Sequence, residues 1–149
     1  MRKFRLISLY FVIFPIFLLN SQIKAEPIVR IDVKTILASN NGRDTDPRLK
    51  GLVRELKSVF RYSSYQLLSQ DRANLRMNRS ERISLPGGRM MSITLKGLSG
   101  RRATLLLEIY KRKEQIFQTV IQLRNQSSVT VGGPEYRGGY LLFNIYNSF

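Results

Sequence analysis

The chain has 149 residues, with 25 lysines and arginines against 10 aspartates and glutamates, and it contains neither histidine nor cysteine. The absence of both residue types excludes Ser–His–Asp and Cys–His catalysis, and it excludes zinc sites built from imidazole and thiolate. Without disulfides, the 43% of hydrophobic residues must supply a real core.

Residues 1–25 have the three-part layout of a secretory signal peptide. A short basic start precedes an uncharged apolar stretch of 14 residues from Leu6 to Leu19, and a polar exit ends in the small residue Ala25. This stretch is short for a membrane span, which needs about 20 residues. We therefore predict cleavage near Ala25 and an exported protein, periplasmic or secreted. An uncleaved N-terminal anchor is the alternative.

The mature chain, residues 26–149, is long enough for one domain and too short for two. Removal of the signal peptide takes away four of the 25 basic residues, so 21 basic and 10 acidic residues remain and the net charge is +11. Such a charge attracts polyanions and acidic surfaces. Because the charges are scattered, a soluble basic surface without a specific partner is the alternative.

A strand and a helix are expected at the start of the mature chain. Residues 28–38 alternate between apolar and polar side chains, which is typical of a strand with one solvated face. After a polar loop, Asp46 can cap a helix of about three turns, and Pro47 suits its first position. Leu52 and Leu56 lie on the apolar stripe of this helix, so we expect both in the core. The alternative is a helix on a membrane surface, because its polar face is basic.

The polar loop holds a pair of carboxylates, Asp44 and Asp46. Paired carboxylates can bind calcium or perform acid–base chemistry. A calcium loop needs more oxygen ligands, and Arg43 and Arg48 lie close by. We therefore interpret Asp46 as a helix cap, and we predict no metal site, no cofactor and no catalytic residue.

From Arg61 onward the pattern is strand, turn, strand. Apolar, β-branched runs recur about every 10 residues between turn residues, and no second long helical period appears. Turns are expected at residues 86–88 and 99–102, and a tight hairpin near residues 112–114. The fold class predicted is α+β, with one amphipathic helix packed on an antiparallel sheet or small β-sandwich of about seven or eight strands.

The segment Gly133–Gly138 has the literal spacing of a phosphate loop. A nucleotide site would need Lys and Ser or Thr next, followed by a helix, whereas Gly139, Tyr140 and a strand follow here. We predict no nucleotide binding and a hairpin in which glycines supply positive φ. Tyr136 and Arg137 at its tip are candidate loop contacts.

The chain ends in Phe149, preceded at alternate positions mainly by apolar residues. This resembles the C-terminal signature of bacterial outer-membrane barrels, but Asn147 stands where an aromatic residue is usual. Residues 103–112 also do not alternate as a lipid-facing strand should. We therefore do not expect membrane insertion.

Three segments carry a resemblance over most of the mature chain: "FRYSSYQLL", "LPGGR" and "VGGP". With the order of motifs around them, they resemble a group of small exported bacterial proteins of unknown function. The resemblance implies a secreted α+β domain and supplies no catalytic residues.

The expected function is non-enzymatic: an exported interaction module with a protein partner in the cell envelope, as an accessory part of an envelope assembly. The alternative is a binder of polyanions such as lipopolysaccharide, an acidic glycan or nucleic acid, and a small hydrolase with an unrecognised site is a further alternative. A polyanion would be bound by basic residues on the solvated face of the strands. The candidates are Arg82, Lys96, Arg102 and Arg112.

Overall fold

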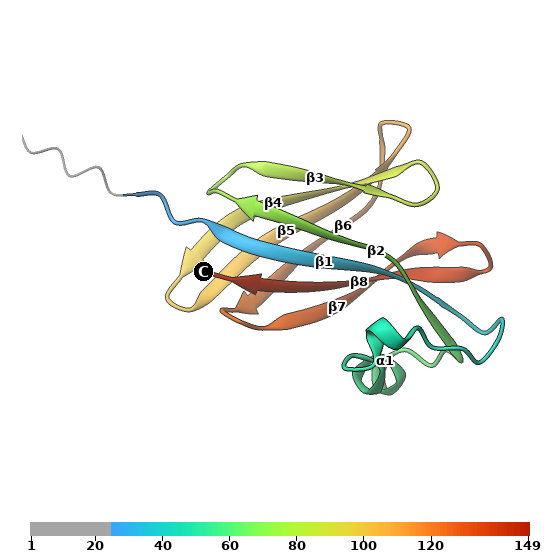
Figure 1. Cartoon of the computed structure of the whole chain (residues 1–149). Coiled ribbons are helices and arrows are strands. Elements are labelled where there is room, and N and C mark those ends of the chain that lie inside the picture. Colours follow the sequence, from blue (N-terminus) through green and yellow to red (C-terminus); the bar gives the residue numbers. More distant parts are fainter. Residues whose placement is uncertain (1–24) are drawn as a thin grey trace, which may run out of the picture.

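The computed structural model describes residues 25–149, so the expected signal peptide, apart from Ala25, lies outside the described residues. The described chain folds into eight strands with one short α-helix and one 3-10 turn (Figure 1). In chain order these are β1 Val29–Ser39, η1 Pro47–Leu49, α1 Val53–Val59, β2 Ser64–Leu75, β3 Ser80–Leu85, β4 Arg89–Ser99, β5 Arg102–Lys111, β6 Glu114–Arg124, β7 Ser128–Tyr136 and β8 Gly139–Ser148. Within these residues no helix is long and apolar enough to cross a membrane.

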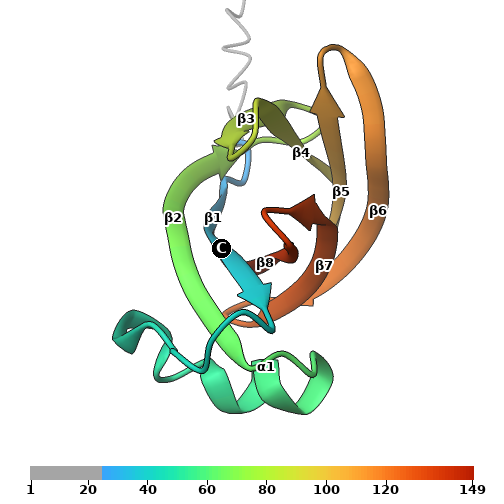
Figure 2. The ribbon, with the colours of Figure 1, turned by 90° about the vertical axis from the view of Figure 1, so that its right-hand side faces the viewer.

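The strands form two four-stranded antiparallel sheets. The first sheet has the order β2-β1-β8-β7, and the second sheet has the order β3-β4-β5-β6. Figure 2 shows the two sheets curving around a common interior. The prediction of an antiparallel protein with seven or eight strands and one helix is confirmed at this level.

The main core lies between the two sheets. Alternate residues of each strand point inward, as the predicted pattern of Val29, Ile31 and Val33 in β1 requires. The second sheet meets them with side chains such as Ile93 and Leu107. Because every second residue is used for this core, the intervening residues of the second sheet are free to form a surface.

A second apolar cluster joins the helical segment to the first sheet. Leu49 and Leu56 are fully buried against Ile36 and Leu142, which lie on the sheet face turned away from the main core. The prediction that Leu56 is a core residue is confirmed. Leu52 is only half-buried beside this cluster, so its placement in the core was wrong.

The helix is shorter than the three turns predicted. A 3-10 turn covers Pro47–Leu49, and the α-helix spans only Val53–Val59. Gly51 stands between the two, and glycine is about 1 kcal/mol less favourable than alanine inside a helix. The two short pieces still bring both Leu49 and Leu56 onto the sheet.

Tyr65 fastens the helical segment to the start of β2. Its hydroxyl donates to the backbone carbonyl of Phe60 and lies 3.3 Å from the carbonyl of Leu56, at the end of α1. Its own backbone accepts from the amide of Asp46 at 2.9 Å. Burial raises the pKa of the Tyr65 hydroxyl, which therefore stays a hydrogen-bond donor.

Asp46 caps η1, as predicted. Its carboxylate accepts from the backbone amide of Arg48 at 2.9 Å and from the Arg48 guanidinium at 2.6 Å. These hydrogen bonds from Arg48, first from its side chain and then from its backbone, lower the pKa of Asp46 from 3.8 to about 2. A carboxyl group whose pKa is lowered on folding stabilises the fold at pH values above its ordinary pKa. This stabilisation is lost as the pH falls through the lowered pKa.

We expect Asp46→Asn to be less stable than the wild type near neutral pH, with the difference shrinking as pH falls from 3.8 to about 2. The ionised carboxylate is what Arg48 holds, and protonation of Asp46 removes the advantage of the wild type. Urea denaturation of both proteins across this range measures the difference. A difference that does not change with pH would contradict the assignment.

Candidate functional site

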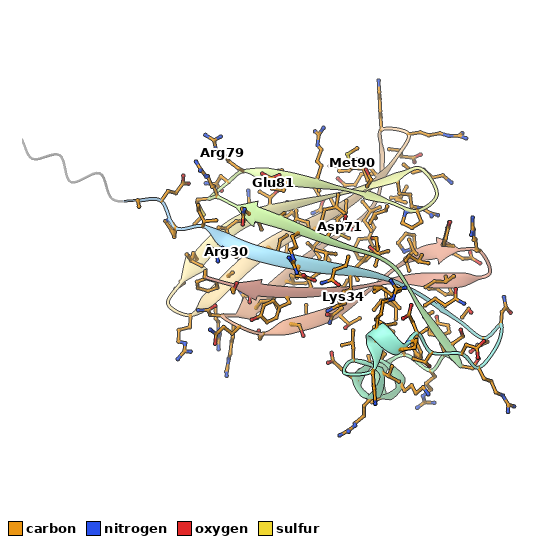
Figure 3. The ribbon with its side chains drawn as sticks, in the orientation of Figure 1. Arg30, Lys34, Asp71, Arg79, Glu81 and Met90 are labelled. Carbon is orange, nitrogen blue, oxygen red and sulfur yellow. The ribbon has the colours of Figure 1, made fainter. Side chains whose placement is uncertain are left out.

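A depression of about 650 Å³ opens on the outer face of the second sheet. Arg82, Ser92 and Glu108 are successive cross-strand partners on β3, β4 and β5. Residues next to them in the chain, such as Ile83, Ile93 and Leu107, point into the core. The side chains of Arg82, Ser92 and Glu108 therefore point outward. We call this depression the basic groove; it is lined by Ser80, Arg82, Gly88, Arg89, Met90, Ser92, Glu108, Tyr110, Arg112 and Lys113. Met90, labelled in Figure 3, marks its position.

The β5–β6 turn supplies two of the cations. Lys111 pairs with Glu114, so Arg112 and Lys113 form a two-residue loop, as the predicted tight hairpin requires. Both have positive φ, +50° and +72°, although neither is glycine. Left-handed backbone costs a non-glycine residue roughly 1–2 kcal/mol. Asn-Gly would make this turn at lower cost, and strain of this kind is concentrated at functional sites.

Arg89 links the groove to the first sheet. Its guanidinium donates to the carbonyl of Glu135 at 2.8 Å and to that of Pro86 at 3.3 Å, and it lies 5.8 Å from the centre of the Tyr136 ring. Sequence reasoning missed this residue, although it directly follows the glycine turn of β3 and β4. With its guanidinium held by two carbonyls, Arg89 is a fixed cation in the wall of the groove.

The other groove cations have no acidic partner. Within residues 25–149 the ion pairs join Asp46 to Arg48 and Asp32 to Arg72, so Arg82, Arg112 and Lys113 are in none of them. Their positive charge is therefore left for an external anion.

Glu108 is the one acidic residue among those lining the groove. Its carboxylate accepts from the Tyr110 hydroxyl at 3.0 Å. This hydrogen bond, with burial, raises the pKa of Tyr110, so the phenol stays neutral and adds no negative charge. The groove thus combines four cations with one carboxylate, which Tyr110 holds by a hydrogen bond without cancelling its charge.

The four predicted anion-binding residues do not form one cluster. Arg82 and Arg112 line the basic groove. Arg102 lies at the opposite end of β5, where it lines a second depression with Arg101 and Arg124. Lys96 is exposed at an irregularity of β4 between Leu95 and Gly97, and it lines neither depression.

At the β7–β8 tip, the two candidate contact residues differ in exposure. The Tyr136 ring is half-buried and packs against the main core. The guanidinium groups of Arg89 and Arg137 also lie near the ring, and that of Arg137 is 5.2 Å from its centre. Part of the Tyr136 aromatic surface is therefore used inside the protein, and part stays accessible. Arg137 is exposed, as expected for a residue at a hairpin tip.

The glycine-rich hairpin is confirmed, but its glycines serve two purposes. Arg137 and Gly138 form the turn with φ of +47° and +72°, which suits glycine at the second position. Gly133 does not have positive φ; a Cβ there would lie 2.3 Å from Cε2 of Phe143. Gly133 therefore allows close approach of the backbone to a core ring.

The outer face of the first sheet carries fewer available cations. Arg30 and Lys34 lie along β1 (Figure 3) and line a shallow depression with Asp32 and Arg72. The Asp32 carboxylate accepts from Arg72 at 3.2 Å and from Gln70 at 2.7 Å. Three cations and one carboxylate line this depression, against four cations and one carboxylate in the basic groove, and Arg72 is already paired with Asp32. The basic groove therefore has more cations left for an external anion.

Comparisons of the chain with protein-family models, curated proteins and solved structures found no match. Among residues 25–149, no group of three or more carboxylates comes together in a way that could hold a metal ion. The chemistry of the groove is that of guanidinium and ammonium groups, which bind phosphate, sulfate and carboxylate.

Proposed function

We propose that this protein is an exported, non-enzymatic interaction module that binds a polyanion in the basic groove. The observation that carries the proposal is the set of three cations, Arg82, Arg112 and Lys113, around a depression whose one carboxylate is engaged by Tyr110. Arginine presents a planar fork that donates two parallel hydrogen bonds to an oxyanion. The proposed scaffold is a β-sandwich with an amphipathic helix docked at one end.

The spacing of the two basic clusters favours an extended ligand. Arg102 begins the 10-residue strand β5, and Arg112 directly follows its last residue. At about 3.3 Å per residue this separation is roughly 33 Å. A single phosphate or sulfate reaches one cluster only. A chain such as an acidic glycan can contact both, so we expect affinity to rise with ligand length.

Export is part of the proposal, and it is supported by the basic, apolar and small-residue layout of residues 1–25. The mature protein should begin at or near Glu26. A native protein that retains Met1, as judged by its mass, would contradict this part.

A protein partner in the cell envelope is the second candidate. It is favoured by apolar side chains on the outer face of β6, where Val120 is 58% exposed and Ile116 is 39% exposed. Exposed apolar groups of this kind are typical of protein contacts.

The test is titration with heparin and with lipopolysaccharide at low and high salt. Replacing Arg82 and Arg112 by serine should weaken binding at least 10-fold, a factor that corresponds to about 1.4 kcal/mol. Binding by the wild type should weaken as salt rises, because ionic contacts supply much of the affinity.

The matched control is Arg54→Ser with Lys57→Ser, two exposed cations on α1. This variant has the same net charge as the groove variant, and we expect it to bind almost as the wild type does. Equal losses in the two variants would mean that net charge alone attracts the polyanion, and this would overturn the proposed site.

A further inference from the structure

Three of the four edge strands have features that prevent pairing with another chain. β2 carries adjacent opposite charges, Asp71 and Arg72, and a bulge. β3 is only six residues long, and β7 contains Pro134 within an irregularity between Gly132 and Glu135. Charges, short length, proline and bulges are the usual protection of a sheet edge.

The fourth edge, β6, has much less protection. It is 11 residues long, and its charged residues, Glu114 and Arg124, are its first and last. The residues between them carry no charge, and Val120 in the middle is 58% exposed. One bulge near Ile116 leaves Phe117–Leu123 regularly paired with β5. An uncharged edge of this length can accept a further strand.

We propose that β6 pairs in antiparallel fashion with β6 of a second copy of this chain, about a two-fold axis near Thr119 and Val120. The two second sheets then become one continuous sheet of eight strands. Around such an axis the same surface is used on both copies, so one patch suffices for a closed dimer.

The charges of β6 favour a second copy of the chain as the partner, and they favour antiparallel over parallel pairing. In antiparallel pairing, Glu114 of each copy approaches Arg124 of the other, at both ends of the interface. Parallel pairing would bring like charges together at each end, which is unfavourable. A strand from another protein would need the same distribution of charge, whereas a second copy has it by necessity.

The half-buried residues of β6 support the pairing. Phe117 and Ile121 pack against the main core from the edge of the sheet, so part of each side chain stays open at that edge. A neighbouring strand covers them and satisfies the outward backbone amides and carbonyls in the middle of β6. At its end, the Arg124 carbonyl already accepts from Ser127. The groove is lined from β3, β4, β5 and the β5–β6 turn, so pairing along the middle of β6 leaves it open.

Salt separates this association from polyanion binding. The pairs of Glu114 with Arg124 at the two ends of the interface favour the dimer. Arg112 and Lys113 lie beside Glu114, however, so the positive charge of each copy also opposes the approach of the other. Screening by salt removes this opposition. Self-association without any polyanion should therefore persist or strengthen at high salt, where binding in the groove weakens.

The test is sedimentation velocity of the mature protein, without polyanion, up to about 1 mM protein. We expect a concentration-dependent dimer that Val120→Lys shifts at least 10-fold toward monomer. Val59→Lys is the matched control, because Val59 is 65% exposed on α1, and it should dimerise as the wild type does. Circular dichroism confirms that both variants are folded.

A charge exchange tests the direction of pairing. Glu114→Arg alone should weaken the dimer, and Glu114→Arg with Arg124→Glu should restore it. A wild type that is monomeric at every concentration, or equal dimerisation by the two lysine variants, would overturn the proposal. Either result leaves heparin binding unaffected, so the two proposals fail separately.

Discussion

Replacing Phe143 by alanine should lower the free energy of unfolding by about 3–5 kcal/mol, because the ring is fully buried in the main core. Phe143 lies on β8, inside the first sheet, where its ring fills the space beside Gly133. Urea denaturation monitored by circular dichroism measures the loss. A loss below about 1 kcal/mol would mean that this core is not packed as described.

The neighbouring glycine provides the control for this prediction. Gly133→Ala alone should be destabilising, because its Cβ would lie 2.3 Å from the Phe143 ring and 3.0 Å from the carbonyl of Leu141. Combined with Phe143→Ala, the added methyl group enters the space that the ring leaves. The double variant should therefore be more stable than the sum of the single effects predicts.

Leu56→Ala should lower the free energy of unfolding by about 2–5 kcal/mol, because Leu56 is fully buried between α1 and the first sheet. Leu52→Ala should cost less, since Leu52 is half-buried. The same denaturation experiment measures both. A loss below about 0.5 kcal/mol for Leu56→Ala would mean that the helix does not pack on the sheet.

Val59→Ala is the control for the helix, because Val59 lies on the same element and is 65% exposed. Its effect should stay within about 0.5 kcal/mol, as is usual for surface substitutions. Alanine forms helices better than leucine or valine, so helix propensity cannot cause a loss in either variant. Similar losses in the Val59 and Leu56 variants would therefore contradict the assigned difference in their burial.

The strands could be predicted because their signals are local. Alternation in residues 28–38 marked β1, and the turns at Gly87, Gly100 and Arg112 separated the later strands at nearly their observed bounds. Period two and turn residues depend only on near neighbours in the chain. The cap at Asp46 has the same local character.

The arrangement of the groove could not be predicted, because it depends on contacts between distant residues. Arg102 does not join Arg82, because Arg82 lies in one row with Ser92 and Glu108, whereas Arg102 pairs with Ser99 at the other end of β5. The contact of Arg89 with Glu135 joins residues far apart in sequence. The half-burial of Tyr136 likewise depends on distant residues, because its ring packs against the main core.

The order of strands in the first sheet has a consequence for how the chain acquires its structure. β1 lies between β2 and β8, and Arg30 near its start pairs with Ser148 near the end of the chain. Such non-local pairing is associated with folding in milliseconds to seconds rather than microseconds. A chain crossing a membrane from its N-terminus would therefore emerge with an incomplete first sheet, and the core would close only after its last ten residues had been released. Until then the apolar edge of β1 would be open to chaperones, to proteases and to other unfinished copies.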